Sequence, residues 1–269
     1  MESGHECCAE LRVISPDKRL RPFVRYYYVL RCNVRKSVPT FPLGCTQMIF
    51  HRRQPLYIPQ LGATQPKFTV SGQTNFPADI VSGGDTEMIV AVFRPYTIGL
   101  FTETPPSEFY NEEIDGCGIG NGPLGKLADR VISADSTGEA IWLVEHYLLS
   151  KLGERLPRHI DRIANAVARI FESPSVRIGD IAGEVCMGEK QFERVFCHHV
   201  GMMPKEYARI VRFQKTLLMM QSGVTGYADI AFAAGYSDQS HFIREFKKFA
   251  GCTPERLTHP YSDLFSVPV

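Results

Sequence analysis

The feature that most constrains the fold is a repeat in the last hundred residues of the chain. Three segments recur in the same order: Asp180-Ile-Ala as Asp229-Ile-Ala at an offset of 49, Phe192-Glu-Arg-Val-Phe as Phe242-Ile-Arg-Glu-Phe at an offset of 50, and Gly201-Met-Met-Pro as Gly251-Cys-Thr-Pro at an offset of 50. A unit that occurs twice in phase predicts two copies of one supersecondary structure. The change of offset places one additional residue in the second turn.

Each unit is predicted to be a short helix, a tight turn and a second helix. The turns lie at Cys186-Met-Gly and Gly235-Tyr-Ser. The second helix of each unit has an apolar face that we expect to be buried, made of Phe192, Val195 and Phe196 or of Phe242, Phe246 and Phe249. Two helices joined by a turn of three or four residues, the second polar outside, are typical of a helix-turn-helix that lays its second helix in a major groove. A fragment of an α-solenoid with ordinary polar surface helices is the alternative.

Reading a major groove requires long side chains on the first two turns of the second helix. Base edges lie at the groove floor, where Arg, Lys, Gln, Asn and His can reach and pair with them. The residues that qualify here are Lys190, Arg194, Gln239, His241 and Arg244. Pro204 is expected to begin a long helix over 205–221 that joins the two units, since proline is well tolerated in a first turn.

The amino-terminal part of the chain predicts a different fold class. Short runs rich in aromatic and β-branched residues occur at 23–30, 46–51 and 86–94, separated by prolines and glycines. Such punctuated runs are typical of an all-β unit, either a sandwich or a small barrel. The fold class is therefore α+β multidomain, with an all-β amino-terminal domain followed by an all-α double helix-turn-helix domain.

A glycine-rich loop at 116–123 marks the change from strands to helices. Helices are expected at 124–132 and 139–152, with Ile141, Trp142, Leu148, Leu149 and Leu152 mainly on one stripe. This pair could serve as a linker, a dimer face or both. We expect a β-rich domain at 1–120, a helical linker at 121–157, the double helix-turn-helix at 158–259 and a tail at 260–269.

The charge of residues 158–259 favours nucleic acid as the partner, whereas the charge of the whole chain does not. The whole chain carries 30 Lys and Arg against 29 Asp and Glu, so the overall balance favours no charged partner. Residues 158–259 hold 14 basic and 11 acidic side chains, an excess of 3, whereas 1–157 hold 16 and 17. Because phosphate neutralisation draws on several cations, we expect modest affinity from one copy and a homodimer on paired sites.

The repeat resembles the AraC/XylS family of bacterial transcription regulators. The similarity covers about 158–257 and is strongest at Gly235-Tyr-Ser-Asp-Gln-Ser-His-Phe-Ile-Arg-Glu-Phe-Lys-Lys-Phe-Ala-Gly-Cys-Thr-Pro. It implies two modules that enter successive major-groove segments of promoter DNA, with RNA polymerase as a further partner. It also implies the DNA-contacting positions Lys190, Glu193, Arg194, Gln239, Ser240, His241 and Arg244. The acidic Glu189 and Glu193 depart from a phosphate-binding surface, although a carboxylate can accept from cytosine N4.

The amino-terminal part is similar, more loosely, to the β-rich sensor domains of some members of that family. The similar segments are Phe41-Pro-Leu-Gly-Cys-Thr-Gln-Met-Ile-Phe and Val92-Phe-Arg-Pro. Such domains are implied to bind a small-molecule effector or to mediate dimerisation. A ligand pocket lined by Tyr27, Phe50 and Phe93 and ordinary core packing of these residues give the same sequence pattern.

The rival interpretation is a β-barrel enzyme with a helical interaction appendage. A metal-dependent oxygenase needs clustered His and carboxylate ligands, but the histidines before residue 116 are His5 and His51, without partners at ligand spacing. Cys7-Cys8 near His5, and His198-His199, are not expected to form metal sites. We therefore expect no enzyme, metal or cofactor. Eight cysteines without a CxxC pair and no membrane-spanning segment point to a cytoplasmic protein.

Overall fold

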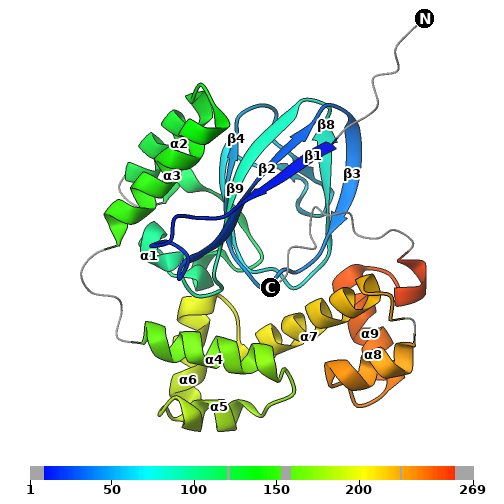
Figure 1. Ribbon diagram of the computed structural model, residues 1–269. Coiled ribbons are helices and arrows are strands. Elements are labelled where there is room, and N and C mark those ends of the chain that lie inside the picture. The colour runs from blue at the N-terminus through cyan, green and yellow to red at the C-terminus, as the bar shows by residue number, and fades with distance from the viewer. Residues whose placement is uncertain (1–8, 120–121, 153–158, 225, 258–269) are drawn as a thin grey trace, which may run out of the picture.

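The computed structural model describes residues 9–119, 122–152, 159–224 and 226–257. The chain forms a β-rich part from residues 9–115, two helices that lie on its outer side, and a helical part that begins at residue 160 (Figure 1). The expected α+β architecture, strands first and the helix-turn-helix units last, is thus confirmed. The exact division into four segments stays a prediction.

Six antiparallel strands form the larger sheet. In spatial order they are β1 (Ala9–Ile14), β2 (Val24–Cys32), β9 (Thr86–Phe93), β4 (Gln47–His51), β7 (Phe68–Ser71) and β10 (Glu113–Asp115). The three predicted strands are β2, β4 and β9, and they lie side by side at the centre of this sheet. They were recognisable because both of their faces are largely covered, which makes them almost continuously apolar.

A second sheet of four antiparallel strands is built from shorter and more polar segments. Its order is β3 (Arg35–Thr40), β8 (Ala78–Gly83), β5 (Tyr57–Ile58) and β6 (Ala63–Thr64). The turn that carries the chain from β8 in this sheet to β9 in the larger one contains Gly84, whose φ of 106° is readily adopted only by glycine. Strands this short and half-exposed show little alternation of apolar and polar residues, so the sequence did not predict them.

The helix pair after the β-rich part covers the outer face of the larger sheet. Helices α2 (Pro123–Ser133) and α3 (Thr137–Lys151) pack on a cluster that includes Tyr27, Phe50 and Phe93, together with α1 (Gly99–Thr102) (Figure 1). Both helices were predicted. One detail was wrong: Trp142 is 56% exposed and stacks on His146 at 5.2 Å, so it does not lie on the buried stripe.

The helical part contains the two predicted helix-turn-helix units. The first consists of α5 (Ile178–Glu184) and α6 (Glu189–Val200), and the second of α8 (Tyr227–Ala234) and α9 (Gln239–Ala250). α4 (Ile160–Glu172) precedes the first unit, and α7 (Pro204–Gln221) runs between the two (Figure 1). The expectation that Pro204 begins the long connecting helix is confirmed.

The repeated Gly-x-x-Pro segment has the same local structure in both units. Gly201 and Gly251 end α6 and α9 in the left-handed region, and their N–H groups donate to the carbonyls of Cys197 and Lys247. Glycine is favoured there because a side chain would clash in that conformation. Each following proline begins the next helical turn. In the repeated motif, the glycine therefore ends one helix and the proline begins another.

The additional residue in the second turn is also visible. The left-handed residues Cys186 and Gly235 are 49 positions apart, whereas the helix starts Glu189 and Gln239 are 50 apart. The second turn therefore gains Asp238, whose carboxylate accepts from the N–H of His241 at 2.7 Å and caps α9. α6 begins after Gly188 without a side-chain cap.

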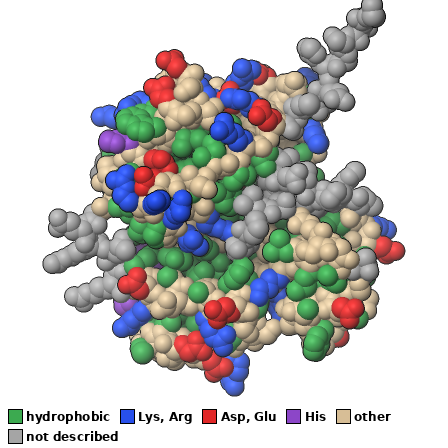
Figure 2. Space-filling view, in the orientation of Figure 1, with side chains coloured by type: hydrophobic (Ala, Val, Ile, Leu, Met, Phe, Trp, Pro, Cys, Tyr) green, Lys and Arg blue, Asp and Glu red, His purple; other side chains and the backbone are tan. Residues whose placement is uncertain are grey.

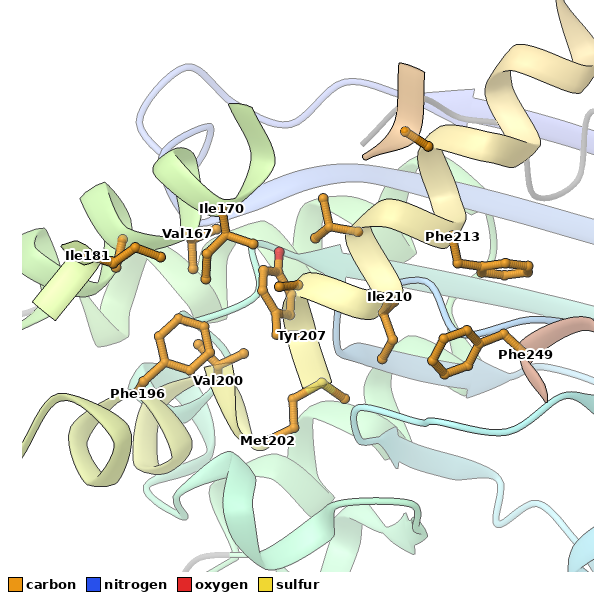
Figure 3. Packing of buried hydrophobic residues seen from close by; sticks show 14 of the residues in the cluster. Val167, Ile170, Ile181, Phe196, Val200, Met202, Tyr207, Ile210, Phe213 and Phe249 are labelled. Carbon is orange, nitrogen blue, oxygen red and sulfur yellow. The ribbon is translucent and has the colours of Figure 1, made fainter. Parts of the chain in front are cut away.

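One hydrophobic core joins both units to the long helix (Figure 3). Phe213 of α7 lies at its centre, with ring centroids 5.3 Å from Phe246 and 5.4 Å from Phe249 of α9. Phe192, Phe196 and Phe242 are fully buried in the same cluster, as predicted, while Val195 is only half-buried. Phe41 from the β-rich part enters this core and packs edge-on against Phe213 at 5.7 Å.

Replacing Phe246 with Ala should lower the free energy of unfolding by about 3–5 kcal/mol, because a fully buried ring leaves a cavity. The matched control is Phe232→Ala in α8, whose side chain is 86% exposed and should change stability by less than about 0.5 kcal/mol. Urea unfolding followed by circular dichroism measures both. Equal effects of the two substitutions would contradict the burial described here.

Candidate nucleic-acid interface

The second helix of the second unit presents its predicted contact residues to solvent. Gln239, Ser240 and Arg244 are exposed on the first two turns of α9. The cap residue Asp238 fixes the start of this helix, and its hydrogen bonds from the His241 N–H and the Ser237 hydroxyl lower its pKa. A helix with a defined start and long polar side chains on its first turns can enter a major groove.

His241 is held more tightly than the other three predicted contacts. Its Nδ1 lies 3.1 Å from the Ser237 hydroxyl, its Nε2 lies 3.9 Å from a Glu245 carboxylate oxygen, and its ring meets Tyr236 edge-on at 5.2 Å. The side chain is half-buried. Its position thus suits support of the helix start better than free reach to a base edge.

A buried carboxylate fixes α9 to the connecting helix. The Glu245 side chain is only 4% exposed and accepts from the Nε atoms of Arg209 at 2.6 Å and Arg212 at 3.3 Å. Arg212 also donates to the carbonyl of Gly235 and stacks over Tyr236 at 4.6 Å. The sequence pattern did not point to Glu245 as a functional residue, because an acid among the polar residues of α9 looks like ordinary surface.

The first unit exposes a different set of side chains on α6. Lys190 and Arg194 are exposed, whereas Glu193 is half-buried. On the face drawn in Figure 2, basic and acidic side chains are interspersed over the helical part without a patch of one sign. On this face, the basic side chains of the helical part are not gathered into one patch.

Helices α6 and α9, the second helices of the two units, border one groove. This groove has a volume of about 790 Å³ and receives Glu189 and Glu193 from α6, His241 and Glu245 from α9, and Lys205, Arg209 and Arg212 from the connecting helix. Ser175, in the loop before α5, donates to the Gly235 carbonyl at 3.0 Å and ties the first unit to the second turn. Of the predicted contact residues, Glu193 and His241 line this groove, whereas the exposed Gln239, Ser240 and Arg244 of α9 are not among its described lining residues.

The opposite side of α6 faces the β-rich part. A second groove of about 530 Å³ has Arg194, Val195, His198 and His199 on one wall, and Tyr96, Glu103 and Pro105 on the other. The contact is close, since a Cβ on Gly201 would lie 2.9 Å from the Pro106 carbonyl oxygen. Arg194 is thus exposed but lies beside the amino-terminal domain.

The histidine pair His198 and His199 lies in the last turn of α6. Burial, with His198 and His159 nearby, lowers the pKa of His199 to about 4, so its imidazole is neutral at physiological pH. Across the described residues, no group of three or more His, Cys, Asp or Glu is arranged to hold a metal ion. His5, Cys7 and Cys8 lie outside the described residues.

The three aromatic residues predicted as a possible ligand pocket pack in a core. Tyr27, Phe50 and Phe93 are fully buried on the sheet face covered by α2 and α3, and Phe50 stacks on Phe68 with centroids 4.6 Å apart. A cavity does exist in the β-rich part, but it lies on the other face of the larger sheet. Its polar residues, among them Gln65 and Glu113, were not singled out because they are far apart in sequence.

Comparison with known families agrees with the geometry of the tail. Residues 181–259 match a family described as a helix-turn-helix domain, and residues 12–115 match one described as a domain of unknown function. The tail of the chain therefore carries a helix-turn-helix domain. The first match covers both recognition helices and the helix that joins them.

Curated relatives are all matched over part of their length. An uncharacterised HTH-type transcriptional regulator of Haemophilus influenzae is 25% identical over 131 residues, which is 47% of this chain and 44% of that protein. The transcriptional regulator ArgR of Pseudomonas aeruginosa is 27% identical over 107 residues, 40% of this chain and 32% of ArgR. RhaS of Pectobacterium atrosepticum, a transcriptional activator, is 29% identical over 87 residues, which is 32% of this chain and 31% of RhaS. The chain thus spans less than half the length of each.

Solved structures give distant matches. ToxT from Vibrio cholerae aligns with a TM-score of 0.46 and 12% identity over 84% of this chain and 94% of ToxT. An AraC-type regulator from Chromobacterium violaceum aligns with a TM-score of 0.34 and 22% identity over 40% of this chain and 96% of that one. Within the described ranges, none of the helices is both long and apolar enough to cross a membrane.

Replacing Glu245 with Ala should lower the free energy of unfolding by about 1–3 kcal/mol, since two arginines lose a buried partner. The matched control is Glu184→Ala, which removes a half-exposed pair with Arg169 and should cost less than about 1 kcal/mol. Thermal or urea unfolding measures both. A loss at Glu184 as large as that at Glu245 would show that the buried clamp has no special role.

Proposed function

We propose that the protein is a sequence-specific DNA-binding transcriptional regulator whose two helix-turn-helix units read adjacent segments of the major groove. The observation that carries this proposal is the pair of helix-turn-helix units, whose second helices α6 and α9 keep long polar side chains exposed and border one groove. The helix-turn-helix family match and the relatives named as transcriptional regulators support it. The same relatives favour a regulator over an enzyme.

The second unit is proposed to supply most of the sequence reading. Arg244 can contact a guanine through two parallel hydrogen bonds and Gln239 can pair with an adenine, because both side chains are exposed on the first two turns of α9. Ser240 can contact either base or phosphate. His241 is assigned chiefly to holding the start of α9, given its contacts with Ser237 and Glu245.

The first unit is proposed to contribute fewer contacts. Lys190 is exposed, whereas Arg194 borders the amino-terminal domain and Glu193 can accept only from a donor such as cytosine N4. The proposal therefore predicts that the first unit makes fewer DNA contacts than the second. A homodimer on paired sites would add the affinity that one copy with a small basic excess lacks.

The β-rich part is proposed to control DNA binding by taking up an effector. Its cavity is separate from the DNA-facing helices, yet the domain packs directly on the connecting helix. Asn75 donates to Glu206 at 2.6 Å, and the Gln214 amide donates to the Pro42 carbonyl. Contact with RNA polymerase at the promoter, and action in the cytoplasm, complete the proposal.

Replacing Arg244 with Ala should weaken specific binding about 5- to 150-fold, corresponding to about 1–3 kcal/mol, and relax the preference at one base pair. Lys247→Ala, on the last turn of the same helix, is the matched control: loss of a phosphate contact would weaken binding uniformly across sequences. Gel-shift titrations against operator variants, selected from bound genomic fragments, measure both. Unchanged relative affinities in Arg244→Ala would remove the proposed base contact.

Binding of the selected operator should also fall steeply as salt rises, because phosphate contacts release counterions. Titrations of the full chain between about 50 and 200 mM salt measure the slope. An affinity that is independent of both salt and sequence would contradict the proposed function as a whole.

A further inference from the structure

The cavity between the two sheets is small and lined by residues from both of them. Its volume is about 90 Å³, below the roughly 150 Å³ of an apolar cavity that admits benzene. Apolar side chains form one wall, among them Ile49, Leu56, Ile58, Ile80 and Met88. A molecule of about four non-hydrogen atoms fits this space.

The polar wall is organised around one carboxylate. Glu113 of β10 accepts from the Ser71 hydroxyl through Oε1 and from the Gln65 amide through Oε2, both at 2.9 Å. Since the carboxylate only accepts, it fixes the Gln65 amide, whose Oε1 then accepts from His51 Nε2 at 2.9 Å. This relay holds Glu113 at the cavity wall instead of letting it swing into solvent.

The cavity is lined by acidic but not by basic side chains. Glu112 and Glu113 belong to its lining, and the described residues that line it include no Lys, Arg or His; His51 lies behind Gln65, to which it is hydrogen-bonded. Burial raises the pKa of Glu113, and the hydrogen bonds from Ser71 and Gln65 oppose that rise. An anionic ligand would add repulsion to desolvation, whereas a cation would offset the desolvation cost of the half-buried Glu113 carboxylate.

Aromatic rings complete a surface that suits a positive charge. Tyr28, Phe41 and Phe76 are part of the lining. Ring faces attract ammonium groups electrostatically, and the attraction is stronger in sites shielded from water. A carboxylate, aromatic rings and small volume together describe a site for a compact amine.

We propose that this cavity binds a small organic ammonium ion, with Glu113 as its charge partner. The inference rests on the proposed function, since it names the chemical class of the effector. It also assigns the ligand to Glu113, Gln65 and the rings around them, away from the core that holds Tyr27, Phe50 and Phe93.

Phe41 connects this cavity with the DNA-facing helix. Phe41 is one of the residues that line the cavity, and its ring packs edge-on against Phe213 in the connecting helix. Phe213 in turn contacts Phe246 and Phe249 of α9. A ligand that displaces Phe41 therefore changes the packing beneath the second recognition helix.

The binding test uses isothermal titration calorimetry on the full chain with n-propylammonium, propionate and n-propanol as probes of matched size. At constant ionic strength, n-propylammonium should bind with a Kd of roughly 0.1–10 mM, as expected for so few atoms, and the other two at least tenfold more weakly. Equal binding of n-propanol, tighter binding of propionate, or no binding of n-propylammonium would overturn the proposal.

Two variants test the site itself. Glu113→Gln removes the charge with little change of shape, and Ile80→Phe fills the cavity without touching the acid; each should weaken n-propylammonium binding at least tenfold. Glu108→Gln, an exposed acid on the 3-10 turn at Pro106–Phe109, is the matched control and should bind as before. Wild-type affinity in both cavity variants, with circular dichroism showing intact folding, would overturn the assignment.

The two proposals fail separately. Calorimetry of n-propylammonium requires no DNA, and the gel shift of the operator requires no ligand. Ammonium binding without operator binding would refute the regulator alone, and operator binding without ammonium binding would refute the ligand class alone. If both hold, saturating n-propylammonium should change operator affinity in the wild type and not in Glu113→Gln.

Discussion

The packing of Phe213 is the interaction on which the rest of this structure depends. Its ring lies in the middle of the connecting helix and contacts Phe246 and Phe249 of the second recognition helix and Phe41 of the β-rich part. Burial of aromatic rings is a large favourable contribution to folding, and interiors packed to crystal-like density transmit displacement rather than absorb it. One residue therefore sets the second unit, the connecting helix and the amino-terminal domain relative to one another.

Polar contacts fix the orientation of the packed elements relative to one another. Glu245 binds Arg209 and Arg212 and prevents α9 from rotating on the connecting helix, while Asn75 and Gln214 anchor the same helix to the β-rich part. Hydrophobic burial is not directional, whereas buried charge pairs and hydrogen bonds have a defined geometry. The orientation of the exposed face of α9 thus follows from contacts made on its hidden face.

The candidate site was only partly accessible from sequence. Gln239, Ser240 and Arg244 could be predicted as exposed because the helical period and the repeat place them opposite Phe242 and Phe246. The restricted surroundings of Arg194 and the tethering of His241 could not, since they arise from residues such as Pro105 and Glu245 on other elements or on another helical turn. Tyr27, Phe50 and Phe93 were equally compatible with a pocket and with a core, and only the position of α2 and α3 places them in the core.

The sequence by itself determined the two helix-turn-helix units, the long helix between them and the three central strands. These features depend on local periodicity, on glycine and proline at helix ends and on continuous apolar runs, all of which are properties of neighbouring residues. Tertiary structure alone decided where the cavity lies, which acid faces it, and how Phe41 reaches the connecting helix. Those contacts join residues separated by tens to more than a hundred positions, and no local pattern specifies which distant segments will meet.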